Sequence, residues 1–173
     1  IVQAAQARKT AWDHVALTVR AGGTCMSGGS LTEDTVIDMT KYMNKFSVDA
    51  KTNTATAQMG TYFRDIEDEA KKHGLMFAGY PSSNRICGIA GMIGNNASGE
   101  KSLRDGATGD NVLSLEVVYA DGSVHTIEPK ATDSIIEKEE QQVFDLFVTH
   151  GAALKAKHHA IKKAAAGYRL DKV

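Results

Sequence analysis

The sequence has little of what marks secreted, membrane or nucleic-acid-binding proteins. It contains two cysteines, Cys25 and Cys87, in 173 residues, so we expect no disulfide framework and a reducing, cytoplasmic compartment. A single disulfide between Cys25 and Cys87 remains an alternative. No apolar run reaches the about 18 residues that cross a bilayer, and residues 1–8 lack the basic flank and apolar centre of a signal peptide. The net charge of -1 gives no electrostatic reason to expect nucleic acid or an anionic membrane as a partner.

The composition is that of a globular protein. Hydrophobic residues make up 42% and charged residues 24%, which excludes a disordered or fibrous chain. The length suits one sizeable domain or two small lobes that share a core. The sequence has no initiator methionine and ends shortly after residues 167–170 (GYRL) without a terminating signal. We therefore expect a piece of a longer protein that begins inside a helix.

Periodicity and turn residues predict mixed helices and strands. Helices are expected at 1–13, from 61 to Gly74, at 134–150 with a stop at Gly151, and over the helix-prone segment 152–166. Strands are expected at 16–20, 35–38 and 54–59, with 43–48 paired beside the last of these. Residues 113–119 and 123–127 are expected to form a hairpin with a type I′ turn at Asp121-Gly122. The helix from residue 61 has the clearest pattern. Phe63, Ile66 and Ala70 share one face, and acidic residues precede basic ones along its length, as the helix dipole favours.

Two glycine-rich segments, 20–29 and 81–99, precede a third at 104–109. The first follows a predicted strand directly, where open α/β folds bind ligands. The glycine pattern of dinucleotide-binding folds is absent, and Gly29 stands where the phosphate-binding lysine of a P-loop would follow Gly23 and Gly28. Transfer of phosphate from ATP or GTP is therefore disfavoured, whereas glycines between small hydroxyl residues predict main-chain amides that face an anion such as a diphosphate. At more than thirty residues, the region from 79 to 112 is functional or contains short helices.

Few isolated residues point to other chemistry. Neither cysteine has a Cys-x-x-Cys partner or a basic neighbour that would lower its pKa, so we expect both to be packed near a ligand rather than redox-active. His150, His158 and His159 lack cysteine or carboxylate ligands at suitable spacing, so no metal site is expected. Arg20 and Arg104 are either anion contacts or ordinary loop arginines.

A series of ordered motifs carries a resemblance to a known family. They are residues 19–24 (VRAGGT), 28–29, 36–38, 81–83, 91–99 (GMIGNNASG), 102–104, 106–108, 110–112 and 116–122, with 167–168 and Leu170 further on. This order resembles the FAD-linked oxidase family, which has the PCMH-type or vanillyl-alcohol-oxidase flavin fold. The nearest branch contains the D-type subunit of glycolate oxidase and the D-lactate and D-2-hydroxyglutarate dehydrogenases.

The resemblance implies an α+β FAD-binding domain of two lobes, a small one with parallel strands and a larger one with antiparallel strands, with FAD between them. The first lobe would comprise residues 1–60 and the second residues 61–173, both truncated, without the substrate cap domain. The implied cofactor contacts are Arg20, Ala21, Gly22, Gly23, Thr24, Cys25, Met26, Ser27, Pro81, Ser82, Ser83, Cys87, Gly88, Ile89, Ala90, Gly91, Asn95, Ser98, Gly99, Gly106 and Val112.

The sequence departs from the family pattern at several positions. Gly88 and Ala90 stand where the family has a threonine and a glycine, and Asp105 replaces a tyrosine. Thr24 occupies the position of the histidine in members with covalent flavin, so FAD is expected to be non-covalent. The chain also ends before the family's next flavin loop. We therefore expect this chain to retain FAD weakly, and a yellow purified sample would contradict that.

The family implies removal of a hydride from the α-carbon of a small 2-hydroxy acid, with FAD as acceptor. No catalytic residue is assigned, because the base and the carboxylate-binding arginine would come from the cap. The sequence does not decide whether an electron acceptor or an iron-sulfur protein is a partner. Through such a partner the protein could attach peripherally at the inner membrane. Two alternatives remain: a diphosphate-binding module, and a flavin-fold subunit without catalytic activity.

Overall fold

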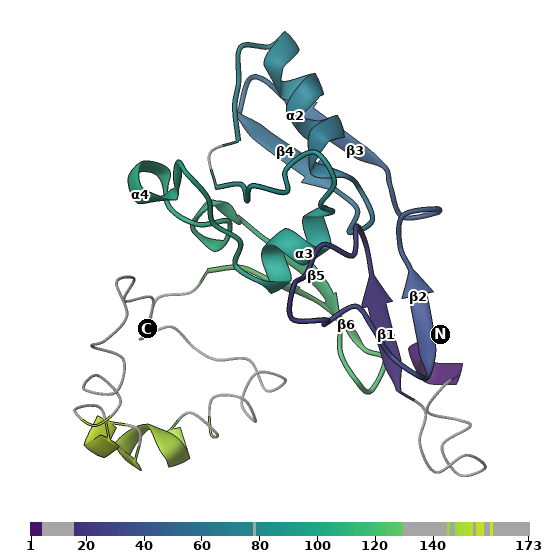
Figure 1. The fold of residues 1–173 in the computed structure, drawn as a ribbon, viewed down its shortest axis with the longest axis vertical. Helices are drawn as coiled ribbons and strands as arrows, with labels where there is room; N and C mark the ends of the chain where they lie inside the picture. Colours follow the sequence, from purple (N-terminus) through teal and green to yellow (C-terminus); the bar gives the residue numbers. More distant parts are fainter. Residues whose placement is uncertain are drawn as a thin grey trace. The chain divides into compact units, whose positions relative to one another are not determined.

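The computed structural model describes residues 1–4, 16–77, 79–129, 145, 148–153, 155–157 and 160. The chain divides into two units, Ile1–Pro129 and Lys130–Val173. The first unit contains the elements β1 to β6 and α2 to α4 shown in Figure 1. Within the described residues, strands pair in three two-stranded sheets, one parallel and two antiparallel. This mixture of helices and paired strands confirms the predicted α+β class.

A parallel pair of strands leads into the first glycine-rich segment. β1 (Leu17–Arg20) pairs with β2 (Thr35–Asp38), with Leu17 opposite Thr35 and Arg20 opposite Asp38. Both strands are rich in β-branched residues, which favour extended backbone. Both strand predictions are confirmed. Residues 21–30 leave the sheet at the carboxyl end of β1. In a parallel pair this edge is where α/β folds bind ligands.

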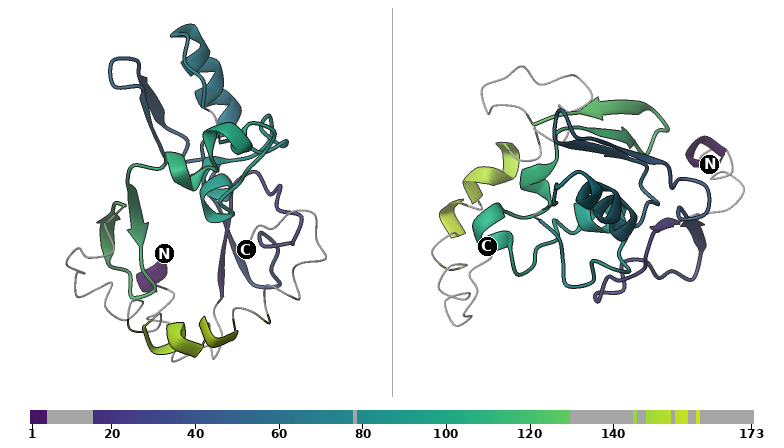
Figure 2. Two further views of the ribbon diagram at one scale, coloured as in Figure 1. Left: turned by 90° about the vertical axis from the view of Figure 1, so that its left-hand side faces the viewer. Right: turned by 90° about the horizontal axis from the view of Figure 1, so that it is seen from above.

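An antiparallel hairpin packs beside a helix that contributes to the core. β3 (Phe46–Asp49) pairs with β4 (Thr54–Ala57), and α2 (Phe63–Lys72) lies beside this hairpin in the views of Figures 1 and 2 and contacts β3. The predicted apolar face of α2 is confirmed, since Phe63, Ile66 and Ala70 are buried. Helix α2 ends before Gly74, whose φ of +70° suits glycine.

The core continues from α2 into the second glycine-rich segment. The Phe63 ring lies 5.7 Å from those of Phe77 and Tyr80 between centroids. The buried cluster contains Phe63, Ile66, Tyr80, Cys87, Ile89 and Met92. The second glycine-rich segment is therefore packed on α2 by its own apolar side chains.

The region from residue 79 to 112 contains short helices, as predicted. They are α3 (Ile89–Gly94), α4 (Ser102–Asp105) and the 3-10 turn η1 (Gly109–Asn111). Thr108 is 1% exposed, and its hydroxyl lies 2.7 Å from the carbonyl oxygen of Gly79 and 2.8 Å from that of Ala97. A Cβ at Gly99 would overlap the carbonyl oxygen of Tyr80. Close packing of main chain against main chain thus shapes this region.

The last hairpin of the first unit is confirmed in position but not in turn type. β5 (Leu115–Val118) pairs with β6 (Val124–Ile127) in antiparallel register. Gly122 has a φ of +83°, but Asp121 is not among the residues with positive φ, and a type I′ turn needs both. The Gly122 amide donates to the Tyr119 carbonyl and the Tyr119 amide to the Ser123 carbonyl. The turn is a longer loop closed by a left-handed glycine.

The ends of the chain are described in part. Residues 2–4 are helical, and the rest of the helix predicted at 1–13 lies outside the described residues. In the second unit, residues 148–153 and 155–157 are helical. The predicted stop at Gly151 is wrong, because the helix continues through it; the other residues of 134–166 lie outside the described set except 145 and 160, which are helical. In the part of the chain that can be described, no helix has the length and apolarity to cross a bilayer.

Candidate functional site

A cavity of about 300 Å³ lies where the two glycine-rich segments meet. This volume is at the lower end of ligand pockets, which measure about 300–1,000 Å³. Its lining comes from β1 and the loop after it, and from α3 with the residues on either side of that helix. The lining residues are Val19, Ala21, Gly22, Gly23, Thr24, Cys25, Gly29, Ser30, Gly88, Ala90, Gly91, Gly94 and Asn95.

The loop after β1 presents main-chain donors to the cavity. Gly23 and Gly28 have φ values of +66° and +75°, a conformation that glycine adopts without strain. Among the described residues, the amides of Gly22, Gly23 and Thr24 donate to no acceptor in the protein, although these residues line the cavity. Successive amides in such a loop form a concave site for an anion.

The main chain of the second segment packs directly against the main chain of the first. A Cβ at Gly22 would overlap the carbonyl oxygen of Ile86 and lie 3.0 Å from the Gly88 nitrogen. A Cβ at Gly88 would lie 2.6 Å from that of Ala21. Gly88 is in turn bridged to Tyr62, while the Phe63 amide donates to the Cys87 carbonyl over 3.0 Å. The start of α2 therefore holds the second loop against the first.

One face of α3 is open toward the cavity. Gly91 and Gly94 both line it, and a Cβ at either position would meet no atom of the described residues within 4 Å. Residues three apart on a helix share a face, so these two glycines and Asn95 form one wall. The absence of side chains at Gly91 and Gly94 leaves this wall accessible to a ligand.

Cys25 lies at the cavity with an acidic thiol. Its Sγ lies 2.9 Å from the Ser27 hydroxyl. Hydrogen bonds to the thiolate from the Ser27 hydroxyl, the Gly29 and Ser27 main-chain amides and Asn95 lower the pKa of Cys25 from 9.0 to about 7. Loop donors thus take the place of the basic neighbour that the sequence lacks. Burial instead raises the pKa of the Cys87 thiol, which is 2% exposed.

We expect alkylation to distinguish the two thiols. Cys25 should react with iodoacetamide with a midpoint near pH 7, because the thiolate is the nucleophile and its pKa is about 7. Cys87 should react only slowly over the same range. Mass spectrometry of the alkylated peptides measures both rates, and Cys25→Ser should remove the fast reaction. A midpoint near pH 9 for Cys25 would contradict the hydrogen-bonding account.

The structure brings together part of the predicted set. Nine predicted residues line the cavity: Ala21, Gly22, Gly23, Thr24, Cys25, Gly88, Ala90, Gly91 and Asn95. The lining does not include Arg20, Met26, Ser27, Pro81, Ser82, Ser83, Cys87, Ile89, Ser98, Gly99, Gly106 or Val112. The roles of all these residues stay predictions. Four lining residues were not predicted, namely Val19, Gly29, Ser30 and Gly94; Gly94 follows Gly91 at helical spacing, a signal that a helix prediction there would have given.

The two candidate arginines have protein partners. Arg104 binds Asp105 with a nitrogen-oxygen distance of 2.7 Å, which raises the pKa of the guanidinium and lowers that of the carboxyl. The guanidinium of Arg20 lies against Gly23, where a Cβ would be 2.5 Å from a guanidinium nitrogen. Arg20 thus supports the first loop. The described residues contain no group of three or more histidine, cysteine, aspartate or glutamate side chains that could hold a metal ion.

Comparison with known proteins gives the family. Residues 2–128 match the FAD binding domain. The chain is 36% identical over 113 residues to D-lactate dehydrogenase of Archaeoglobus fulgidus, covering 65% of this chain and 25% of that protein. It is also 36% identical over 112 residues to D-2-hydroxyglutarate dehydrogenase of Pseudomonas putida, covering 64% of this chain and 11% of the relative. This chain therefore spans a quarter or less of the length of these curated relatives.

Solved structures show the same fold. 6-Hydroxy-D-nicotine oxidase of Arthrobacter nicotinovorans aligns with a TM-score of 0.64 at 24% identity, over 73% of this chain and 26% of that one. Alkyldihydroxyacetonephosphate synthase aligns with a TM-score of 0.61 at 26% identity, over 76% and 26%. The predicted PCMH-type flavin fold is confirmed.

The cavity fits part of FAD. Free amides at Gly22, Gly23 and Thr24 are suitable donors for a diphosphate, and the open face of α3 leaves room for an attached group. This donor set requires no lysine, which agrees with the absence of a P-loop. FAD is thus the cofactor of this fold. The chain belongs to the FAD-linked oxidase family, and residues 2–128 are its FAD binding domain.

Proposed function

We propose that this chain is the FAD-binding part of a flavin-dependent oxidoreductase that dehydrogenates a small 2-hydroxy acid. The cavity between the two glycine-rich segments carries the proposal, because its open wall and free amides suit a flavin dinucleotide. The relatives named D-lactate dehydrogenase, D-2-hydroxyglutarate dehydrogenase and glycolate oxidase subunit GlcD support the substrate class. Bound FAD supplies the acceptor for the hydrogen on the substrate α-carbon.

The residues of this chain bind and orient the cofactor. The amides of residues 22–24 hold the diphosphate, and Gly91 and Gly94 admit the adjoining part of FAD. The binding is non-covalent, since Thr24 offers no imidazole for attachment. The other predicted contacts belong to this proposal, as do the lobes at 1–60 and 61–173. An electron acceptor outside this chain would reoxidise the flavin.

Anaerobic flavin bleaching tests the proposal. The whole protein is reconstituted with FAD and mixed with D-lactate, glycolate or D-2-hydroxyglutarate, and the oxidised flavin band is followed. Loss of the band with one of these acids is the expected result. Bleaching by a different alcohol alone would overturn the substrate class and leave the cofactor assignment intact.

A non-catalytic flavin-fold subunit or diphosphate-binding module is the second candidate. Ala90 lines the cavity where the family has glycine, and Gly88 lacks the family's hydroxyl. These changes reduce the space and the donors for a flavin. Stoichiometric FAD binding without bleaching by any acid or alcohol would favour this candidate.

A further inference from the structure

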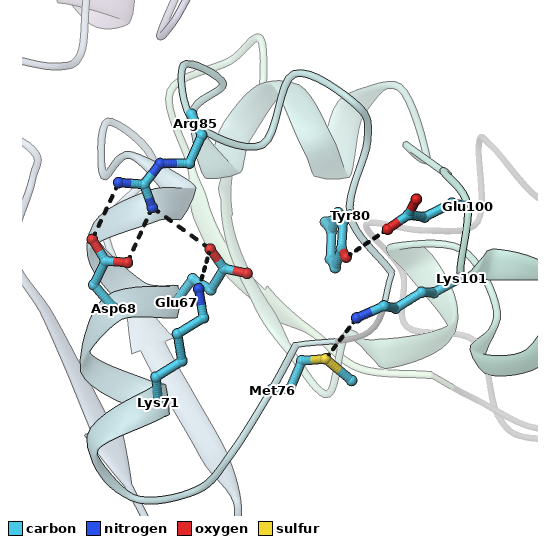
Figure 3. Close-up of polar contacts among 8 residues, drawn as sticks. All are labelled: Glu67, Asp68, Lys71, Met76, Tyr80, Arg85, Glu100 and Lys101. Atoms are coloured by element: carbon cyan, nitrogen blue, oxygen red, sulfur yellow. Dashed lines mark hydrogen bonds and ion pairs between the residues drawn. The ribbon is translucent and has the colours of Figure 1, made fainter.

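A cluster of charged residues joins the second glycine-rich loop to α2. Figure 3 shows Arg85 of this loop between Asp68 and Glu67 of α2. The guanidinium donates to both carboxylate oxygens of Asp68, at 3.0 and 3.4 Å, and lies 3.7 Å from Glu67. None of these residues lines the cavity.

The same loop residue is also held through its main chain. The Arg64 guanidinium donates to the Arg85 carbonyl oxygen over 2.9 Å. Arg64, Glu67 and Asp68 are three and four residues apart, so they share one face of α2. Glu67 is 8% exposed and is kept paired by Lys71 at 3.0 Å. One face of a packed helix therefore contacts both the side chain and the backbone of Arg85.

Arg85 lies next in sequence to the residues that contact the first loop. Its neighbour Ile86 provides the carbonyl oxygen that abuts Gly22, and Gly88 follows two residues after Ile86. The amides of Ile86 and Cys87 both donate to the Ser83 carbonyl at 2.9 Å, which makes this turn move as a unit. A shift of Arg85 is therefore transmitted to the contact between the two loops.

We propose that Arg85 is a positioning residue for FAD, which fixes the second glycine-rich loop against the first through its ion pairs with Asp68 and Glu67. The inference rests on the proposed binding of FAD at this cavity and not on the identity of the substrate. Arg85 is 58% exposed at its side chain, and exposed pairs contribute little to global stability. Their loss should therefore affect the loop and its ligand more than the fold.

The test compares charge variants of the whole protein. Arg85→Glu faces two carboxylates, and we expect the Kd for FAD to rise about fivefold, the change that corresponds to about 1 kcal/mol. Adding Asp68→Arg should recover at least about half of this loss, since the pair is re-formed with reversed charges. Fluorescence titration with FAD measures the Kd, and thermal unfolding of the apoprotein should change by less than about 3 °C.

Lys72→Glu is the matched control. It makes the same change in net charge as Arg85→Glu, but Lys72 pairs at 2.6 Å with Glu69 of its own helix rather than with the loop. Its Kd for FAD should remain that of the wild type. An unchanged Kd in Arg85→Glu, an equal loss in Lys72→Glu, or no recovery in the double variant would each overturn the proposal.

Hydrogen exchange separates this inference from the proposed function. In the apoprotein, Arg85→Glu should speed exchange of the Ile86 and Cys87 amides about fivefold, because their turn is released. If the wild-type protein binds no FAD, the proposed function fails while faster exchange still supports the positioning role. Unchanged exchange at both amides would overturn that role.

Discussion

Gly22→Ala is expected to lower both the stability of the protein and its affinity for FAD. The new Cβ would overlap the Ile86 carbonyl oxygen and lie 3.1 Å from the Cys87 Cα, and these backbone atoms have little freedom to move. Overpacking of this kind costs about 1–3 kcal/mol in the free energy of unfolding, or roughly 3–10 °C in melting temperature. The loops would separate, and the Kd for FAD should rise about tenfold or more, a loss of ~1.4 kcal/mol.

Differential scanning calorimetry and FAD titration measure the two effects. Gly151→Ala is the matched control, because the residue is helical and a Cβ there meets no atom within 4 Å in the part of the chain that the structure describes. That variant should keep the wild-type Kd. A Gly22→Ala protein with unchanged melting temperature and Kd would show that the two loops do not approach as described.

Gly91→Leu is expected to block FAD without destabilising the fold. Gly91 lines the cavity on α3, and a Cβ there meets no atom within 4 Å. A leucine side chain would occupy the space of the cofactor, so we expect the Kd to rise about a hundredfold, equivalent to ~2.7 kcal/mol. Glycine in a helix costs roughly 0.5–1 kcal/mol relative to alanine, so the apoprotein should unfold at an equal or higher temperature.

A loss of FAD affinity together with a gain in stability distinguishes blocked binding from damaged folding. Gly91→Ala should give the same gain in stability with a smaller loss of FAD affinity. Gly151→Leu places the same side chain at a helical glycine that is not among the lining residues of the cavity, and it should leave the Kd unchanged. Tight FAD binding by Gly91→Leu would mean that the cofactor does not lie against this face of α3.

Local sequence signals were sufficient for most of the secondary structure of the first unit. Strand 16–20 followed at once by glycines, the α2 face of Phe63, Ile66 and Ala70, and the hairpin around Gly122 are each set by neighbours in sequence. The type I′ turn was wrong because Asp121 keeps a negative φ, a choice between related turns that the Asp-Gly pair does not fix. The stop at Gly151 failed because glycine is tolerated inside a helix.

The residues that line the cavity were predicted in part. Thr24 and Gly88 were expected near a diphosphate, and both line the cavity. Gly94 was missed because its exposure to the cavity depends on α3, a helix of six residues with too little length for a periodic pattern. The lowered pKa of Cys25 was missed because its main donors, the Ser27 hydroxyl and the Gly29 and Ser27 amides, come within reach of the sulfur only through the turn of the loop.

The sequence by itself determined the family and the α+β class, because glycine spacing and apolar periodicity are local properties of the chain. Only the tertiary structure decided which residues line one cavity, how closely Gly22 approaches Ile86, and that Arg85 joins the second loop to α2. These features depend on backbones brought together from distant positions. Packing on α2 sets those distances, and no local pattern encodes them.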